Sequence, residues 1–500
     1  MIPPKDQSHT RWLWVALAAL SLANVWPFAA YRYVPFMDHP SLLLKANVIR
    51  HYTDEQLRYF ENFQINAIPA PNVLADYLMA ATALWMPIDW AGRLVVALTV
   101  FLLPLSVLFW LARAAPGNVP WAVLALTMTW SRFLYSGNEG FCLASCLLFW
   151  LCGLLARWDG QPRGPSLLLR MSLATAIYLT HFLVFFLAGL AVLVHAAIGG
   201  RSVRSWLTHA AILAPGLVLG SLWFLSGGLS GSPTPPDPFS ISYKVQAVAD
   251  GIWPAPWRAT GASSCALGLA LVCFVVFRAV AAWNTERRFA AALCLAYVVP
   301  ALLTTRYVML HFPDQRFWWL TVLCSLSLFP PLARGPALAV WLFGLAAAIG
   351  TNLDAARHFK KAENALIRAE QTFARFPKRL RLAYLGDPGL PPELHRCFEY
   401  YHIRSGGMGP HHLMGRHNSV RYKGHEPPRL TIADFGPYAL GPWLDAYEAV
   451  LIFSNPTADS TRMVSALQEN GYRLHSQLPF ALLLHPRYPV REPPIGVRAP

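Results

Sequence analysis

The sequence predicts a mainly α-helical fold: a polytopic membrane helix bundle with about 11 transmembrane helices, followed by a small C-terminal α/β soluble domain. Three observations predict it. Of the 500 residues, 55% are hydrophobic and only 13% are charged, whereas a soluble globular domain carries about 25% charged residues. The apolar residues form blocks of about 16 to 24, long enough to cross a bilayer core. This pattern ends near residue 352.

Eleven apolar segments account for the predicted crossings. The first follows Lys5 and Arg11 and lacks a small-residue cleavage site, so we expect an uncleaved anchor. The apolar stretch 167–198 is too long for one span, and we divide it near Thr180 and His181. The predicted spans are 12–30, 91–112, 119–136, 139–156, 167–182, 183–198, 204–226, 260–280, 289–306, 317–333 and 335–352.

The segment 70–88 is apolar but contains Asp76 and lies between Pro71 and Pro87. If it does not cross, the N-terminus is inside, the tail is outside, and the short inner loops hold most of the basic residues of the membrane part, as the positive-inside rule requires. These inner residues are Lys5, Arg11, Arg113, Arg157, Arg163, Arg170, Arg201, Arg204, Arg278, Arg287, Arg288 and Arg334. We therefore place 70–88 on the outer surface or in a re-entrant helix.

The formal net charge of +15 comes largely from the excess of basic residues in the predicted inner loops, which sets the orientation, together with a mildly basic tail. It gives no reason to expect nucleic acid as a partner. Of the eight cysteines, only Cys397 lies outside the apolar segments, so the sequence has no disulfide framework.

The end of the apolar pattern near residue 352 divides the chain into two domains. Residues 1–352 form the transmembrane domain, with interfacial helices in the first outer loop (31–90), and residues 353–500 form the soluble extracytoplasmic domain. An amphipathic helix over 354–376 leads into the tail, where helices near 391–403 and 458–470 alternate with strands. The predicted strands are RLRLAYLG, AVLIFSN and FALLLHP.

Polar residues at membrane depth are expensive and are functional candidates by default. With eleven crossings they gather at the outer ends of the spans, where they suit an amphiphile with an anionic head and a lipid tail. The candidate catalytic residue is Asp38. The candidate substrate-binding residues are His39, Glu139, His181, Arg306, His311 and Arg316.

Asp38 stands between Pro35 and Pro40, which stiffen the backbone on either side. A carboxylate held rigidly at the interface can act as a general base towards a hydroxyl. The alternative is a helix cap, and Glu139 is likewise either a second acid or a neighbour of a helix start.

Arg306 and Arg316 flank the last outer loop and can clamp a lipid phosphate or snorkel to ordinary headgroups. His181 can orient a substrate or hydrogen-bond a neighbouring helix. In the tail, His402, His411, His412, His417 and His425 have no cysteine or carboxylate at ligand spacing, so a surface or acceptor-binding loop is favoured over a metal site. We predict no metal and no cofactor, although a divalent cation is compatible with the sequence.

The arrangement resembles the GT-C superfamily of membrane glycosyltransferases. The resemblance is carried by Asp38 early in the first outer loop, by interfacial helices at about 41–64 and 70–88, and by broken spans before a soluble outer domain. The stretches FQINAIPAPNVLADYL, YSGNEGFCLASCLLFW and YLTHFLVFFLAGL look like segments of bacterial membrane proteins grouped loosely with these enzymes. The chain departs from many members because His39, not a second acid, follows Asp38, and because no WWDYG-type motif is present.

The resemblance implies transfer of a sugar from a polyprenyl-phosphate-linked donor to a glycan, lipid or protein hydroxyl on the outer face of a bacterial inner membrane. Asp38 is then the base, and Arg306 and Arg316 contact the phosphate. Two alternatives stay open: a transporter or flippase for a lipid or lipid-linked glycan, and a non-catalytic envelope-assembly protein with this fold. The near-absence of ionisable residues at mid-span counts against the transporter.

Overall fold

The structure is a computed structural model of the whole chain. The residues it describes are 6–66, 70–158, 164–199, 202–226, 262–303, 313–374, 376–386, 396–409, 418–423, 447–453, 464–465, 467–469, 473–476 and 481–484.

The chain divides into two compact units that do not follow sequence order. The first contains Met1–His39, Asn66–Glu363 and Arg416–Ser419. The second contains Pro40–Ile65, Asn364–Gly415 and Val420–Pro500. The predicted first outer loop, which we assigned to the membrane domain, thus contributes Pro40–Ile65 to the same unit as most of the tail. The domain boundary at 352/353 stays a prediction.

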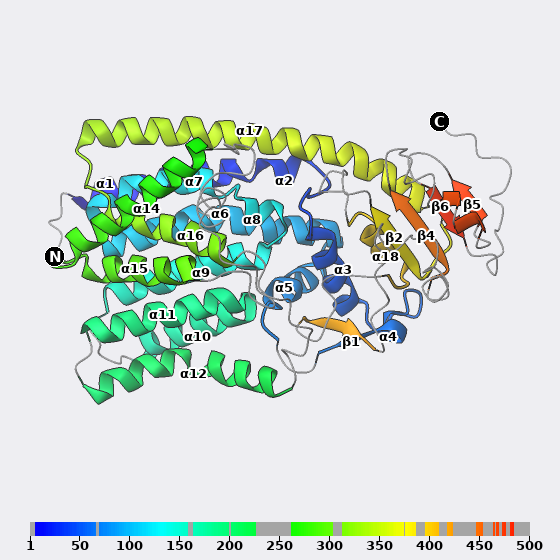
Figure 1. Cartoon of the computed structure of the whole chain (residues 1–500), viewed down its shortest axis with the longest axis horizontal. Coiled ribbons are helices and arrows are strands. Elements are labelled where there is room, and N and C mark those ends of the chain that lie inside the picture. The colour runs from blue at the N-terminus through cyan, green and yellow to red at the C-terminus, as the bar shows by residue number, and fades with distance from the viewer. Residues whose placement is uncertain are drawn as a thin grey trace. The chain divides into compact units, whose positions relative to one another are not determined.

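The first unit is a bundle of helices that lie side by side (Figure 1). Its long elements are α1 (Asp6–Asn24), α6 (Ile88–Ala114), α9 (Glu139–Ala156), α10 (Gly164–Thr180), α11 (Phe182–Gly199), α12 (Val203–Leu225), α14 (Ala262–Ala282), α15 (Arg288–Leu303), α16 (Pro313–Ser325) and, as far as Glu363, α17 (Arg334–Phe373). The short helix α2 (Trp26–Ala30) follows α1. In the described residues, six helices are long and apolar enough to cross a membrane. The chain is a multi-pass membrane protein.

Two predicted boundaries can be compared directly with these helices. The division of 167–198 is confirmed, since α10 ends at Thr180 and α11 begins at Phe182. The expectation of one continuous helix over 119–136 is wrong. That segment consists of a 3₁₀ helix, η1 (Pro116–Val123), and two short helices, α7 (Leu124–Met128) and α8 (Arg132–Tyr135). Pro116 and Pro120 lack the N–H groups that a regular helix would use.

The segment 70–88 does not form a span. Its only described helix, α5 (Leu74–Thr82), has nine residues and is about 13 Å long, less than half of a hydrocarbon core. The chain then turns into α6, which is 27 residues long. This agrees with the predicted non-crossing position of 70–88.

Several basic residues of the predicted inner loops cap helix ends. Arg157 donates to the carbonyl of Ala112 at the end of α6, and Arg170 donates to Leu154 near the end of α9. Arg287 donates to Phe329 just beyond the 3₁₀ helix η3 (Leu326–Leu328). A cation at a helix C-terminus satisfies carbonyls that have no partner within the helix. These arginines therefore stabilise the bundle in addition to carrying the predicted orientation signal.

The second unit contains α3 (His39–Arg50) from Pro40 onwards, α4 (Tyr59–Asn62), α18 (Glu399–Ser405) and two sheets. The larger sheet has the order β2–β4–β6–β5, with β2 and β4 parallel and the other pairs antiparallel. Its strands are β2 (Leu382–Gly386), β4 (Ala449–Phe453), β5 (Arg473–Ser476) and β6 (Ala481–Leu484), so the three predicted strands are confirmed. The smaller sheet pairs β1 (Phe63–Ile65) with β3 (Val420–Tyr422).

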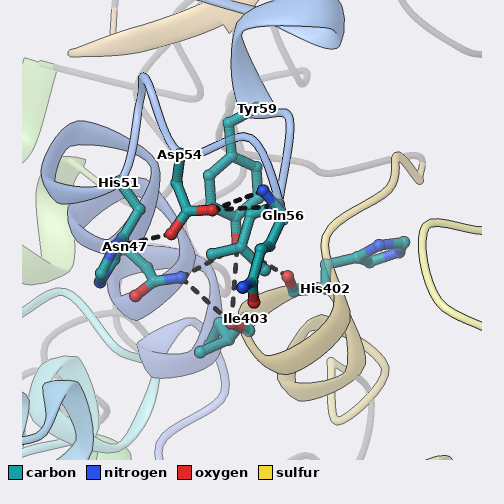
Figure 2. A network of polar contacts seen from close by, with 8 residues as sticks. Asn47, His51, Asp54, Gln56, Tyr59, His402 and Ile403 are labelled. Atoms are coloured by element: carbon teal, nitrogen blue, oxygen red, sulfur yellow. Dashed lines mark hydrogen bonds and ion pairs between the residues drawn. The ribbon is translucent and has the colours of Figure 1, made fainter.

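A buried polar network joins the first-loop segment to the tail inside this unit (Figure 2). Asn47 Nδ2 donates to the Tyr59 hydroxyl at 2.9 Å and to the Ile403 carbonyl at 3.1 Å, and the Tyr59 hydroxyl donates to the His402 carbonyl at 2.7 Å. Burial raises the pKa of Tyr59, so its hydroxyl stays a donor. Helix α3 is therefore fastened to α18, and Asp38 lies immediately before the first residue of α3.

Candidate active site

Asp38 is held against the turn that connects α8 to α9. The Met37 N–H donates to the Tyr135 carbonyl at 3.0 Å. Gly137 lies in the turn with φ +79°, and a Cβ at this position would lie 2.6 Å from both the Cβ and the backbone nitrogen of Asp38. Only glycine combines this left-handed backbone with so close an approach. Gly137 therefore sets the position of the half-buried Asp38.

The turn is built by local hydrogen bonds. The Ser131 hydroxyl accepts the N–H of Leu134 and caps α8, and the Ser136 hydroxyl donates to the Arg132 carbonyl. The N–H of Gly137 donates to the Leu134 carbonyl. These contacts end α8 after one turn and place Glu139 at the first position of α9.

His39 and Glu139 form a buried pair beside Asp38. The Nδ1 atom of His39 lies 2.6 Å from Oε1 of Glu139, and each side chain is 1% exposed. Glu139 stands at the N-terminus of α9, where the helix dipole favours a negative charge. The pair connects the chain directly after Asp38 to the turn on which Asp38 rests.

Arg316, near the start of α16, is buried in the same cluster. Its Nη2 donates to Asn138 Oδ1 at 2.6 Å, and its Nη1 lies 3.3 Å from His181 Nε2. The guanidinium also lies 5.3 Å from the centre of the Phe141 ring. Asn138 directly follows Gly137, against which Asp38 lies, so Arg316 binds the same turn as Asp38 does. The cluster thus combines a carboxylate with a cation held in a fixed orientation.

His181 lies at the break between α10 and α11. Arginine only donates hydrogen bonds, so Nε2 of His181 accepts from Arg316 and the imidazole proton is on Nδ1. The buried atoms of the cluster without a hydrogen-bond partner in the described part of the chain include His181 Nδ1, Arg316 Nε and Glu139 Oε2. Unpartnered buried polar atoms are costly and point to a ligand or water.

Five of the seven predicted site residues lie at one end of the bundle: Asp38, His39, Glu139, His181 and Arg316. Arg306 and His311 lie outside the described residues. Gly137 was missed at the level of sequence, although a glycine just before the start of an apolar helix is a usable signal. Gln315, whose Oε1 accepts a hydrogen bond from Arg132 at 3.2 Å, has no such signal.

No cluster suited to a metal is found among the described histidines, cysteines and carboxylates. Of the predicted His cluster in the tail, His402 is fully buried and its Nδ1 lies 3.1 Å from the Gly406 carbonyl. His411, His412, His417 and His425 lie outside the described residues.

The helix bundle, the broken spans and the helices of the first loop define a polytopic membrane protein, and this architecture agrees with the resemblance to the GT-C superfamily. Among solved structures, the chain is similar to ArnT from Cupriavidus metallidurans in the apo state, with a TM-score of 0.59 and 12% identity over 95% of this chain and 98% of that one. ArnT bound to undecaprenyl phosphate matches with a TM-score of 0.55 and 13% identity over the same shares. No family model and no curated protein matches the chain. At these identities the likeness establishes the fold.

Proposed function

We propose that this protein is a glycosyltransferase that moves a sugar from a polyprenyl-phosphate-linked donor to an acceptor hydroxyl on the extracytoplasmic face of a bacterial inner membrane. The observation that carries the proposal is the fixed position of Asp38 on Gly137, in the same cluster as the buried Arg316. The fold agrees with it, because a structure of similar fold binds undecaprenyl phosphate.

In this proposal Asp38 is the catalytic base. Its carboxylate takes the proton from the acceptor hydroxyl as the acceptor oxygen bonds to the anomeric carbon of the sugar. The bond between that carbon and the phosphate oxygen breaks, and the polyprenyl phosphate leaves with both electrons of the bond. A phosphate is a good leaving group, so the reaction needs no general acid.

Arg316 and His181 are the proposed phosphate contacts. The N–H groups at Arg316 Nε and His181 Nδ1 are buried, and no described residue accepts from them. Donors fixed in advance at the site of developing negative charge stabilise a transition state at little reorganisation cost. The pair of His39 and Glu139 keeps the turn that carries Asp38 in place. Arg306 and His311 remain proposed contacts on the predicted outer loop.

The test is sugar transfer by the purified full-length protein from polyprenyl-phosphate donors to candidate acceptors. We expect Asp38→Asn to lower transfer by about a thousandfold or more, while undecaprenyl phosphate binding and thermal stability are retained. Asp54→Asn is the matched control, because Asp54 belongs to the same loop and caps an exposed turn by accepting from the Gln56 N–H at 2.7 Å. Transfer that survives Asp38→Asn overturns the role of Asp38.

Two further assays separate the alternatives. Liposomes that contain the protein and a labelled lipid-linked sugar test for transport, and movement of the lipid without transfer would favour a flippase. Alkaline phosphatase fused after residue 500 tests the proposed orientation. It is expected to be active there and inactive when fused near residue 160.

A further inference from the structure

We propose that Asn72, in the turn before α5, is a positioning residue that sets His181 for the bound phosphate. The inference rests on the proposed function for the role of His181 and adds a residue outside the cluster. Asn72 has a left-handed backbone, with φ +65°. The turn that contains it precedes α5, which begins at Leu74.

The turn contacts both sides of the break at His181. Before the break, the N–H of Val73 donates to the Leu179 carbonyl at 2.8 Å. After the break, the N–H of Phe182 donates to Asn72 Oδ1 at 3.1 Å. Phe182 is the first residue of α11, and its N–H has no partner within that helix. Asn72 therefore caps α11 from a distant part of the chain.

The break itself needs this support. The N–H of His181 still bonds to Ile177 at 2.8 Å, and the His181 carbonyl accepts from Phe185 at 3.1 Å, so the chain is helical on either side of it. A Cβ on Gly140 would lie 2.9 Å from the Thr180 carbonyl, so α9 also packs closely against the break. Without the Asn72 cap, the first turn of α11 can shift, and the His181 imidazole shifts with it relative to Arg316.

Contacts of α5 hold the turn that contains Asn72. The Ser419 hydroxyl donates to Oδ2 of the fully buried Asp76 at 2.6 Å. The Asn66 N–H donates to the Ser419 carbonyl at 3.0 Å. Ser419 belongs to the first unit although it comes from the tail sequence. Ser419, a residue of the tail, thereby holds α5, and the turn before α5 holds His181.

The variants follow from the geometry of Asn72. Asn72→Gly keeps the left-handed backbone and removes the side-chain acceptor. Asn72→Asp keeps the acceptor and tolerates the same backbone. Ser202→Ala is a matched control at another helix start, because the Ser202 hydroxyl caps α12 by accepting from the Ser205 N–H at 3.2 Å.

Two measurements decide the proposal. In hydrogen exchange, the amides of 181–185 are expected to exchange at least about tenfold faster in Asn72→Gly than in the wild type or in Asn72→Asp. In binding assays with undecaprenyl phosphate, Asn72→Gly is expected to weaken binding about tenfold, whereas Asn72→Asp and Ser202→Ala bind as the wild type does. In a His181→Ala background, Asn72→Gly is expected to add no further loss.

If the amides of 181–185 exchange at the same rate in Asn72→Gly as in the wild type, Asn72 does not hold the break, whether or not the protein binds the lipid. Equal weakening in the presence and absence of His181 overturns the action through His181. A wild type that binds no undecaprenyl phosphate overturns both the phosphate role of His181 and the proposed function. Exchange at 181–185 then still reports whether Asn72 holds the break.

Discussion

The Nδ1 atom of His39 lies 2.6 Å from Oε1 of Glu139, across 100 positions of the sequence, and both side chains are excluded from solvent. This pair ties the residue after Asp38 to the first residue of α9. It therefore couples the position of Asp38 to the turn on which Asp38 rests.

We expect Glu139→Ala to destabilise the protein by about 1–3 kcal/mol, because the His39 ring is then left without this partner in a buried site. Glu139→Gln keeps an oxygen that can accept from Nδ1 and is expected to cost less. Thermal unfolding in detergent measures both variants. If His39→Ala and Glu139→Ala add without coupling in the double variant, the two side chains do not act as a pair.

Gly137→Ala is expected to displace Asp38, because a methyl group at this position would lie 2.6 Å from the Asp38 backbone and would also meet a positive φ. Transfer is expected to fall by about a hundredfold, since a shift of about 1 Å in a reacting group has an effect of this size. Gly164→Ala at the start of α10 is the control, because its added Cβ would meet nothing within 4 Å. Equal transfer by the two variants would contradict the role of Gly137.

Arg316 illustrates what sequence reasoning could and could not predict. The number of predicted membrane crossings placed four residues at the same end of the spans, because each successive span reverses direction. These residues are Asp38, Glu139, His181 and Arg316. The lengths of the apolar segments are sufficient for this placement. They could not predict that Asn138 and His181 are the residues that orient the guanidinium, since such pairings depend on how the helices pack against each other.

Long-range contacts also determine where residues 40–65 of the predicted first outer loop belong. Alternating apolar residues predicted the strands of the tail, where the pattern is local. The pairing of Asn47 with Ile403 spans 356 positions and has no local signal, so the compact unit formed by residues 40–65 with the tail was not predicted. The apolar composition of 119–136 favoured one helix, but the prolines and the capped turn at Ser131 break it.

Arg316→Lys tests whether geometry or charge matters at this position. The guanidinium reaches Asn138 with one nitrogen and His181 with another, at 2.6 and 3.3 Å, and a single ammonium cannot reproduce that fork. We expect binding of undecaprenyl phosphate to weaken about tenfold in Arg316→Lys and further in Arg316→Ala. Arg357→Lys is the control, because Arg357 is exposed and pairs with Asp354 one turn earlier on α17. Full binding by Arg316→Lys would show that charge alone suffices.

Glu399 makes the second unit sensitive to pH. Burial raises the pKa of this carboxyl to about 7, against the opposing effect of Arg396 and smaller effects of Ser41, His402 and Lys45. A carboxyl with a raised native pKa binds its proton more tightly in the folded state than in the unfolded state, where the pKa is 4.5. Its contribution to stability is therefore fully present below about pH 4.5 and is lost as the pH rises towards 7.

The size of this contribution is on the order of 3 kcal/mol, since each pKa unit corresponds to about 1.4 kcal/mol. Glu399→Gln keeps a neutral side chain of the same shape at every pH. The variant is therefore expected to match the wild type at low pH and to be more stable than the wild type at pH 8. Thermal unfolding of the full-length protein between pH 4.5 and 8 measures the difference, and hydrogen exchange in α18 assigns it to this unit. A wild type more stable than Glu399→Gln at pH 8 would mean that the ionised carboxylate is stabilised by its basic neighbours, opposite to the burial effect.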